Sequence, residues 1–166
     1  YYFFGALLLF PYLLSLLRLV SRDRIKQLFL RWNFKGMSKI EMQRAGINFY
    51  LKMQRKCYPK ALDWIQAQHE LGTELVLVSA SCKEWLAPFA QAFQAEILCT
   101  TLEYDSQEVC TGNWSGKNVR GREKVEIVRR NFDLQQYNEI VAFGNEQADL
   151  HLGEIANSVY LNYFRA

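Results

Sequence analysis

Before residue 73 the apolar positions of the chain recur at helical intervals, and after it they form short runs. The first part is therefore expected to be all helical, with Gly36 and Pro59 separating its segments. Ser38 and Glu41 have the spacing of a capping box and mark the start of one of these helices. The predicted helices cover residues 23–34, 38–58 and 62–72.

The second part alternates between apolar runs and amphipathic segments. Residues 74–79 (ELVLVS) form a nearly continuous apolar run, which is typical of a strand buried on both faces of a parallel sheet. The polar turn at 105–108 favours a hairpin between its two flanking runs. Strands are predicted at 74–79, 96–99, 101–104, 109–114, 140–143 and 158–162, and helices at 83–93, 122–132 and 149–156.

Alternating strands and helices predict an α/β fold, a Rossmann-like parallel sheet with flanking helices, preceded by a helical cap. We expect the cap segment at 1–60 and the α/β core at 61–166. Half of the 166 residues are apolar and 22% are charged, which excludes a disordered protein and fits one domain with an appendage.

Charge is distributed unevenly along the chain. Residues 1–60 contain twelve Lys and Arg against two acidic residues, whereas 61–166 contain eight against fifteen. This asymmetry indicates either a basic face for an anionic partner or membrane surface, or two halves that neutralise each other when packed. Because the basic residues are spread over several helices and no nucleic-acid-reading motif is found, we expect no nucleic-acid partner.

Residues 1–17 contain no charge, and cations follow them. Gly5 and Pro11 interrupt the run, which is at the lower length limit for a membrane-spanning helix. Three alternatives remain: a buried or capping helical hairpin, an interfacial or re-entrant membrane helix, and a true span. A membrane surface is accordingly one candidate partner of residues 1–35. The cations follow the apolar run instead of preceding it, which does not fit a signal peptide.

The four cysteines are scattered and include no CxxC pair. We interpret them as reduced thiols of a cytoplasmic protein, either free in the cytoplasm or peripheral at the inner face of a membrane, and expect no zinc site. The chain begins with Tyr1, not Met, so we expect it to be a fragment of a longer protein.

Three polar clusters fall where a parallel sheet binds ligands, at strand ends and at the starts of the following helices. Ser79, Ala80 and Ser81 follow the first apolar run and offer a hydroxyl and backbone N–H groups to an anion, although a Ser at such a turn is often only a helix cap. Lys124 lies in the first turn of a predicted helix, where the helix dipole disfavours a cation unless an anion is near. Alternatively it is an exposed Lys beside Glu123.

The third cluster, GNEQAD at 144–149, follows the strand IVAF. Asn145 and Asp149 offer oxygen ligands of the kind that Mg²⁺ prefers. Singly, they could equally be a turn Asn and an Asp at a helix N-terminus. All three clusters occur in order along the sheet, which makes a shared phosphate and metal site the stronger interpretation.

These clusters resemble the motifs of the haloacid-dehalogenase-like superfamily, specifically its phosphoserine-phosphatase-like branch. LVLVSAS resembles the second motif, GREK the third and GNEQAD the fourth, and the apolar helical stretch at 3–38 resembles the helical cap segment. The resemblance implies that Ser79 binds phosphate with Ala80 and Ser81, that Lys124 is catalytic and binds substrate, and that Asn145 and Asp149 hold Mg²⁺.

Two departures from the family pattern matter. The first motif, Asp-x-Asp-x-Thr, is absent, and with it the first central strand of the family sheet and the nucleophilic Asp. Asn145 stands where the family has an acidic residue, so metal affinity is expected to fall. We therefore expect the isolated fragment to be inactive and poorly stable.

The resemblance implies a Mg²⁺-dependent phosphatase that hydrolyses a phosphate monoester through an aspartyl-phosphate intermediate. The substrate is a phosphorylated small molecule or, because the cap is basic and apolar, a lipid phosphate. The alternatives are a non-catalytic relative that binds phosphate and a membrane-anchored protein.

Overall fold

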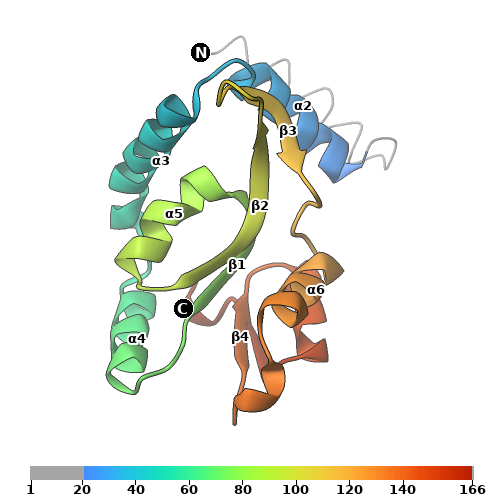
Figure 1. Cartoon of the computed structure of the whole chain (residues 1–166). Helices are drawn as coiled ribbons and strands as arrows, with labels where there is room; N and C mark the ends of the chain where they lie inside the picture. The colour runs from blue at the N-terminus through green and yellow to red at the C-terminus, as the bar shows by residue number, and fades with distance from the viewer. Residues whose placement is uncertain (1–20, 166) are drawn as a thin grey trace. The chain divides into compact units, whose positions relative to one another are not determined.

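The computed structural model describes residues 21–165. A mainly helical first half leads into strands that alternate with helices, as Figure 1 shows. The helices are α2 (Arg22–Phe34), α3 (Lys39–Met53), α4 (Pro59–Glu70), α5 (Lys83–Ala92) and α6 (Arg122–Asn131), and the strands are β1 (Val76–Cys82), β2 (Glu96–Tyr104), β3 (Cys110–Ser115), β4 (Val141–Gly144) and β5 (Ser158–Leu161). Short 3₁₀ segments are η1 (Gln54–Lys56), η2 (Leu134–Gln136), η3 (Gln147–Glu154) and η4 (Tyr163–Arg165).

The helix boundaries follow local sequence signals. Ser38 and Glu41 form the predicted capping box: the Glu41 carboxylate accepts from the Ser38 N–H at 2.8 Å, and the Ser38 hydroxyl accepts from the Glu41 N–H at 3.3 Å. Pro59 is the first residue of α4, a position where its missing N–H costs nothing. Gly36 follows α2 with a φ of +90°, a conformation that glycine adopts without strain. The three predicted helices are thus confirmed.

The strands form two sheets. β1 pairs in parallel with β2, and β2 continues into an antiparallel pairing with β3. β4 and β5 form a separate parallel pair, from Val141 opposite Ser158 to Gly144 opposite Leu161. The α/β fold with parallel strand pairs and the predicted hairpin are confirmed.

Three predicted elements differ in detail. The runs at 96–99 and 101–104 are one strand, β2, because it first pairs with β1 and then with β3. The strand predicted at 74–79 is β1, shifted to Val76–Cys82, although the Leu75 carbonyl already accepts from the Glu96 N–H at 2.8 Å. The last predicted helix is the 3₁₀ segment η3, which begins with a capping box between Glu146 and Asp149.

The described residues pack into two compact units. Unit 1 comprises residues 21–42 and 101–116, and unit 2 comprises 43–100 and 117–165. Unit 1 places α2 against the β2–β3 hairpin, with Leu30, Leu102 and Cys110 buried. Unit 2 buries residues of β1, β2, α6 and η3, with Val125 fully enclosed. The predicted domain boundary near residue 60 stays a prediction, because packing units and folding domains need not coincide.

Unit 2 contains a cavity between its two parallel strand pairs. The cavity has a volume of about 530 Å³ and is lined by residues 76–78 of β1 and 141–143 of β4, with Trp64, Val128 and Phe132 among its walls. Each of β1 and β4 has one strand partner, β2 and β5 respectively, so within residues 21–165 neither strand is paired along its second edge. The first central strand that the resemblance implies is therefore missing from the described sheet.

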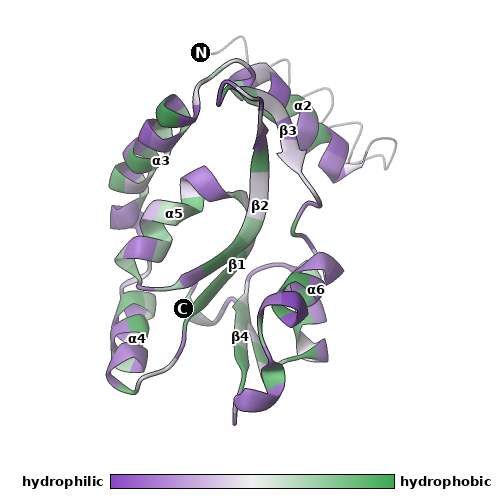
Figure 2. Ribbon diagram, viewed as in Figure 1, coloured by the Kyte–Doolittle hydropathy of each residue, from purple (hydrophilic) through white to green (hydrophobic). Residues whose placement is uncertain are grey.

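Apolar and polar segments are mixed along most helices in Figure 2, with the apolar colour strongest on β1 and β4. The predicted membrane segment at 1–17 lies outside the described residues. No helix within 21–165 is long and apolar enough to cross a bilayer.

Candidate active site

A buried ion pair joins α6 to η3. Lys124, on the first turn of α6, places its Nζ 2.5 Å from Oδ1 of Asp149. The side chains are 15% and 5% exposed. Since buried charges are costly unless they are paired, the fold holds these two residues together as a unit.

The second carboxylate oxygen of Asp149 organises the turn after β4. Oδ2 accepts hydrogen bonds from the backbone N–H groups of Asn145 at 2.9 Å and Glu146 at 3.1 Å. The Glu146 carboxylate in turn accepts from the Asp149 N–H, which completes a capping box. Gly144 is required here because a Cβ on it would collide with the Asp149 side chain. The GNEQAD segment is therefore built around Asp149.

The environment of Asp149 determines its protonation. Burial by itself raises the pKa of the carboxyl group. The hydrogen bonds from Lys124 and from the Asn145 and Glu146 N–H groups outweigh burial, so the pKa lies below its ordinary value of 3.8. Asp149 is thus an anion at neutral pH, and it holds a cation in the site.

Thr100 positions the loop that leads to Lys124. Its fully buried hydroxyl donates to the Asn118 side-chain oxygen and accepts from the Val119 N–H, both at 3.0 Å. Gly121 then turns the chain into α6 with a φ of +56°. The sequence analysis missed Thr100 and Asn118, because nothing in their local sequence shows that two distant polar residues meet in the core.

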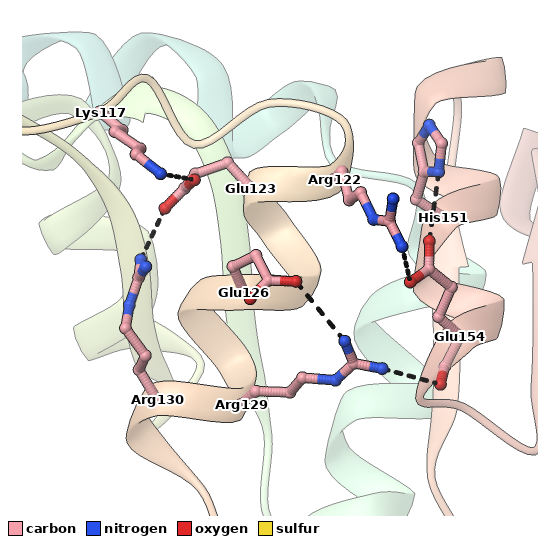
Figure 3. A network of polar contacts seen from close by, with 8 residues as sticks. All are labelled: Lys117, Arg122, Glu123, Glu126, Arg129, Arg130, His151 and Glu154. Atoms are coloured by element: carbon pink, nitrogen blue, oxygen red, sulfur yellow. Dashed lines mark hydrogen bonds and ion pairs between the residues drawn. The ribbon is translucent and has the colours of Figure 1, made fainter.

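Ion pairs surround the outer side of α6, as Figure 3 shows. Glu123 binds both Arg130 at 2.6 Å and Lys117 at 3.2 Å, and Arg122 reaches Glu154 at 3.2 Å. The pKa of Glu123 lies below its ordinary value, chiefly because Arg130 donates a hydrogen bond to its carboxylate. Burial raises this pKa, and Lys117 lowers it further. Outside the view, Arg120 approaches Glu146 at 3.5 Å and links the two turns that carry Lys124 and Asp149. The sequence analysis missed these partners too.

Ser79 lies on β1 beside Cys99 of β2. Its hydroxyl accepts from the Ser81 N–H at 3.1 Å, and the pairing of β1 with β2 shifts register between Ser79 and Cys82. Among the described residues no hydrogen bond joins Ser79 to Lys124 or Asp149. The structure thus brings Lys124, Asn145 and Asp149 together, while the shared role of Ser79, Ala80 and Ser81 stays a prediction.

The model of the haloacid dehalogenase-like hydrolases matches residues 3–154 of the chain. The chain belongs to the haloacid dehalogenase-like hydrolases. Protein CicA from two Caulobacter vibrioides strains, NA1000 / CB15N and ATCC 19089, is 26% identical over 164 residues, covering 98% of this chain and 73% of CicA.

Two solved structures share the fold of this hydrolase. A protein of unknown function from Bordetella pertussis Tohama I superposes with a TM-score of 0.74 at 19% identity, over 86% of this chain and 66% of that one. A HAD family hydrolase from Salmonella enterica serovar Typhi superposes with a TM-score of 0.59 at 16% identity, over 90% of this chain and 50% of that one. The chain thus spans only part of these relatives, and the phosphoserine-phosphatase-like branch stays a prediction.

The predicted Mg²⁺ ligands of this hydrolase can be tested against the geometry. Both oxygens of Asp149 are engaged, by Lys124 and by two N–H groups. Within residues 21–165 no cluster of three acidic, Cys or His side chains could hold a metal ion. The exposed Asn145 amide offers one further oxygen. The described residues therefore do not fit a complete Mg²⁺ site by themselves, and the metal role of Asn145 and Asp149 stays a prediction.

Lys124 nevertheless keeps the means to bind an anion. An ammonium group has three N–H donors, and Asp149 Oδ1 takes one of them. The others could bind phosphoryl oxygens, with Asp149 holding the ammonium group in place.

Proposed function

We propose that this hydrolase is a phosphatase that releases phosphate from a monoester through an aspartyl-phosphate intermediate. The observation that carries the proposal is the buried Lys124–Asp149 pair at the turn that follows β4. A fixed ammonium group in a site of low exposure stabilises the charge that develops on a phosphoryl group during transfer.

The reaction needs a nucleophilic Asp. The first family motif, Asp-x-Asp-x-Thr, which supplies it, is absent from residues 1–166. In the proposed mechanism, a carboxylate oxygen attacks phosphorus while the ester P–O bond breaks and the leaving alkoxide takes a proton. Water then attacks the acyl phosphate, which releases inorganic phosphate and restores the carboxylate. Lys124 binds the phosphoryl oxygens in both steps. Ser79, with the backbone at Ala80 and Ser81, supplies further donors.

The cavity between β1 and β4 supports this proposal. A strand added there would pair with the second edges of β1 and β4, which no strand within residues 21–165 occupies, and its side chains would meet apolar walls on both faces. We infer that the strand carrying the nucleophile occupies this cavity in the active protein.

For the substrate, we propose a phosphate monoester with an apolar, lipid-like group. The excess of Lys and Arg in residues 1–60 and the uncharged run at 1–17 support this choice. We place the protein in the cytoplasm, at the inner face of a membrane. Mg²⁺ dependence is part of the proposal, with ligands that must include residues beyond those described.

Phosphate release tests the proposal directly. A longer form of the protein that carries the first motif should hydrolyse a monoester in the presence of Mg²⁺, whereas residues 1–166 alone should not. Lys124→Ala should reduce turnover in the longer form by about 10²–10³-fold. Lys117→Ala, which removes a 73% exposed Lys from the segment before α6, should leave turnover nearly unchanged. Phosphate release by residues 1–166 would refute the expected inactivity of this fragment, and normal turnover by Lys124→Ala in the longer form would refute the proposed role of Lys124.

A non-catalytic phosphate-binding protein is the second candidate. Asn145 at the predicted metal position and the engaged oxygens of Asp149 favour it. In this case inorganic phosphate would protect the longer form against heat in a Lys124-dependent way, with no hydrolysis at any Mg²⁺ concentration. A membrane-anchored protein without either property would show neither effect.

A further inference from the structure

One face of α2 is fully used inside unit 1. Leu30 is buried, and the Gln27 side chain donates to the Gly112 carbonyl at 3.2 Å and to the Asn113 side-chain oxygen at 2.7 Å. Lys26 lies over the Trp114 ring at 5.1 Å. These contacts fix the rotation of α2 on the β2–β3 hairpin, and they define which of its side chains point away from it.

The opposite face of α2 is apolar. With about 3.6 residues per turn, Ile25, Leu28, Phe29 and Trp32 fall on one stripe. Phe29 is 39% exposed and Trp32 is 44% exposed, although both are large apolar side chains. Exposed aromatic residues grouped on one helix face commonly mark an interaction surface.

Basic residues border this stripe. Arg22 lies about one helical turn before Ile25, at the start of the stripe. Three further basic residues lie along the edge of the stripe that contains Leu28: Arg24, Arg31 and Lys35. All four basic residues are exposed, and Asp23 is the single acidic residue of α2. An apolar stripe with Phe and Trp, bordered by cations, is the arrangement of helices that lie in a membrane interface.

We propose that α2 docks on an anionic lipid bilayer through Ile25, Leu28, Phe29 and Trp32. The helix has 13 residues, so at about 1.5 Å per residue it is far too short to span a bilayer and lies along its surface. The aromatic side chains enter the boundary between headgroups and acyl chains, while the bordering cations bind anionic headgroups. Charge complementarity selects an anionic lipid surface over an acidic protein groove, because the exposed cations border the convex face of a helix. This surface does not depend on the hydrolysis proposed above.

Vesicle sedimentation tests the proposal with residues 1–166. We expect binding to vesicles of phosphatidylcholine with about one third phosphatidylserine, with weaker binding at high salt and on pure phosphatidylcholine. The variant Phe29→Ala/Trp32→Ala should bind at least about tenfold more weakly. Arg24→Glu/Lys35→Glu should also weaken binding, whereas the matched control Lys52→Glu/Arg55→Glu, which changes the exposed end of α3 and η1, should not. Equal binding by all variants would assign any membrane affinity to another segment and overturn the proposal.

Trp32 fluorescence provides a second readout, which can be measured on the wild type and does not require the double variants to fold. Vesicles should shift the emission of the wild type to shorter wavelength, and brominated acyl chains should quench it. Trp32→Phe, which keeps the surface apolar, should remove most of the shift while still binding. If acrylamide cannot reach Trp32 before vesicles are added, another part of the chain or a second copy covers α2. That result, or an emission change that persists in Trp32→Phe, would contradict the proposal.

Discussion

One ion pair from each unit of the chain shows how exposure changes what a pair contributes. In unit 2, Lys124 and Asp149 form an ion pair whose side chains are 15% and 5% exposed. In unit 1, Lys39 and Glu108 approach to 2.6 Å, but their side chains are 45% and 65% exposed. Both pairs have a short distance between nitrogen and oxygen, but only the pair in unit 1 is exposed to solvent. The two pairs therefore differ in their exposure and not in their closeness.

This difference determines what each pair contributes. An exposed pair contributes about 0–1 kcal/mol, because water and salt screen it. A buried pair gives little net stability over an apolar replacement, but removing one partner leaves an unpaired buried charge.

Replacing Lys124 should have the largest effect. Lys124→Met is expected to lower the free energy of unfolding by about 3–5 kcal/mol, because Asp149 stays buried without its cation. Urea denaturation followed by circular dichroism measures this loss. The control is Lys117→Met, which removes the exposed partner of Glu123 and should cost less than about 1 kcal/mol. Equal losses in both variants would contradict the contrast between buried and exposed pairs.

Gly112 provides the corresponding test in unit 1, where close packing of the β3 backbone against α2, and not an ion pair, is disturbed. Its φ is +80°, and a Cβ would lie 2.7 Å from Arg31 Cα and 3.1 Å from Lys35 Cβ. Gly112→Ala should therefore separate α2 from β3 and cost about 2–3 kcal/mol.

Gly116 is the matched control for Gly112. It has a similar φ of +72° but nothing within 4 Å of its Cβ position, so Gly116→Ala should cost only about 1 kcal/mol of backbone strain. Hydrogen exchange should show loss of protection in α2 for Gly112→Ala alone. The same loss in both variants would show that backbone strain, and not close packing, is responsible.

Sequence patterns predicted the elements well where local chemistry determines them. Pro59 and the Ser38–Glu41 box begin helices at the expected places, and the apolar run before Ser79 became a parallel strand. The family motifs also identified Lys124 and Asp149, whose contact spans 25 positions of sequence. These signals succeed because each depends on a few adjacent residues or on a known motif.

The rest depends on distant packing that no local pattern records. The Thr100 hydroxyl meets the loop at 118–119, and Arg120 approaches Glu146, only because the fold brings those segments together. Likewise, helical spacing predicts which side chains of α2 share a face, but not which face the hairpin covers. Engagement of both Asp149 oxygens could not be foreseen, since it depends on a turn closed by two backbone N–H groups.

Acid should weaken unit 2 through Asp149. Its folded pKa lies below the ordinary value of 3.8, so the unfolded state binds more protons there, and stability falls as the pH decreases through and below that value. One such group changes stability by at most about 1.4 kcal/mol per pH unit. Urea denaturation between neutral and acidic pH should show this slope in the wild type. Asp149→Asn should flatten it, and an unchanged slope in that variant would assign the effect to other carboxyl groups.

The smallest effect is expected from loss of the helix cap at the start of α3. The Ser38 hydroxyl accepts from the Glu41 N–H and donates to the Glu41 carboxylate at 2.7 Å, in an exposed position. Ser38→Ala removes these bonds and should cost about 1 kcal/mol, whereas Ser38→Thr should keep most of the stability because Thr also caps helices. Since the contacts are exposed, water replaces part of the loss, and this limits the cost to well below that of Lys124→Met. If Ser38→Ala costs as much as Lys124→Met, exposure does not set the size of these effects, and the contrast between a charged interior and a polar surface is wrong.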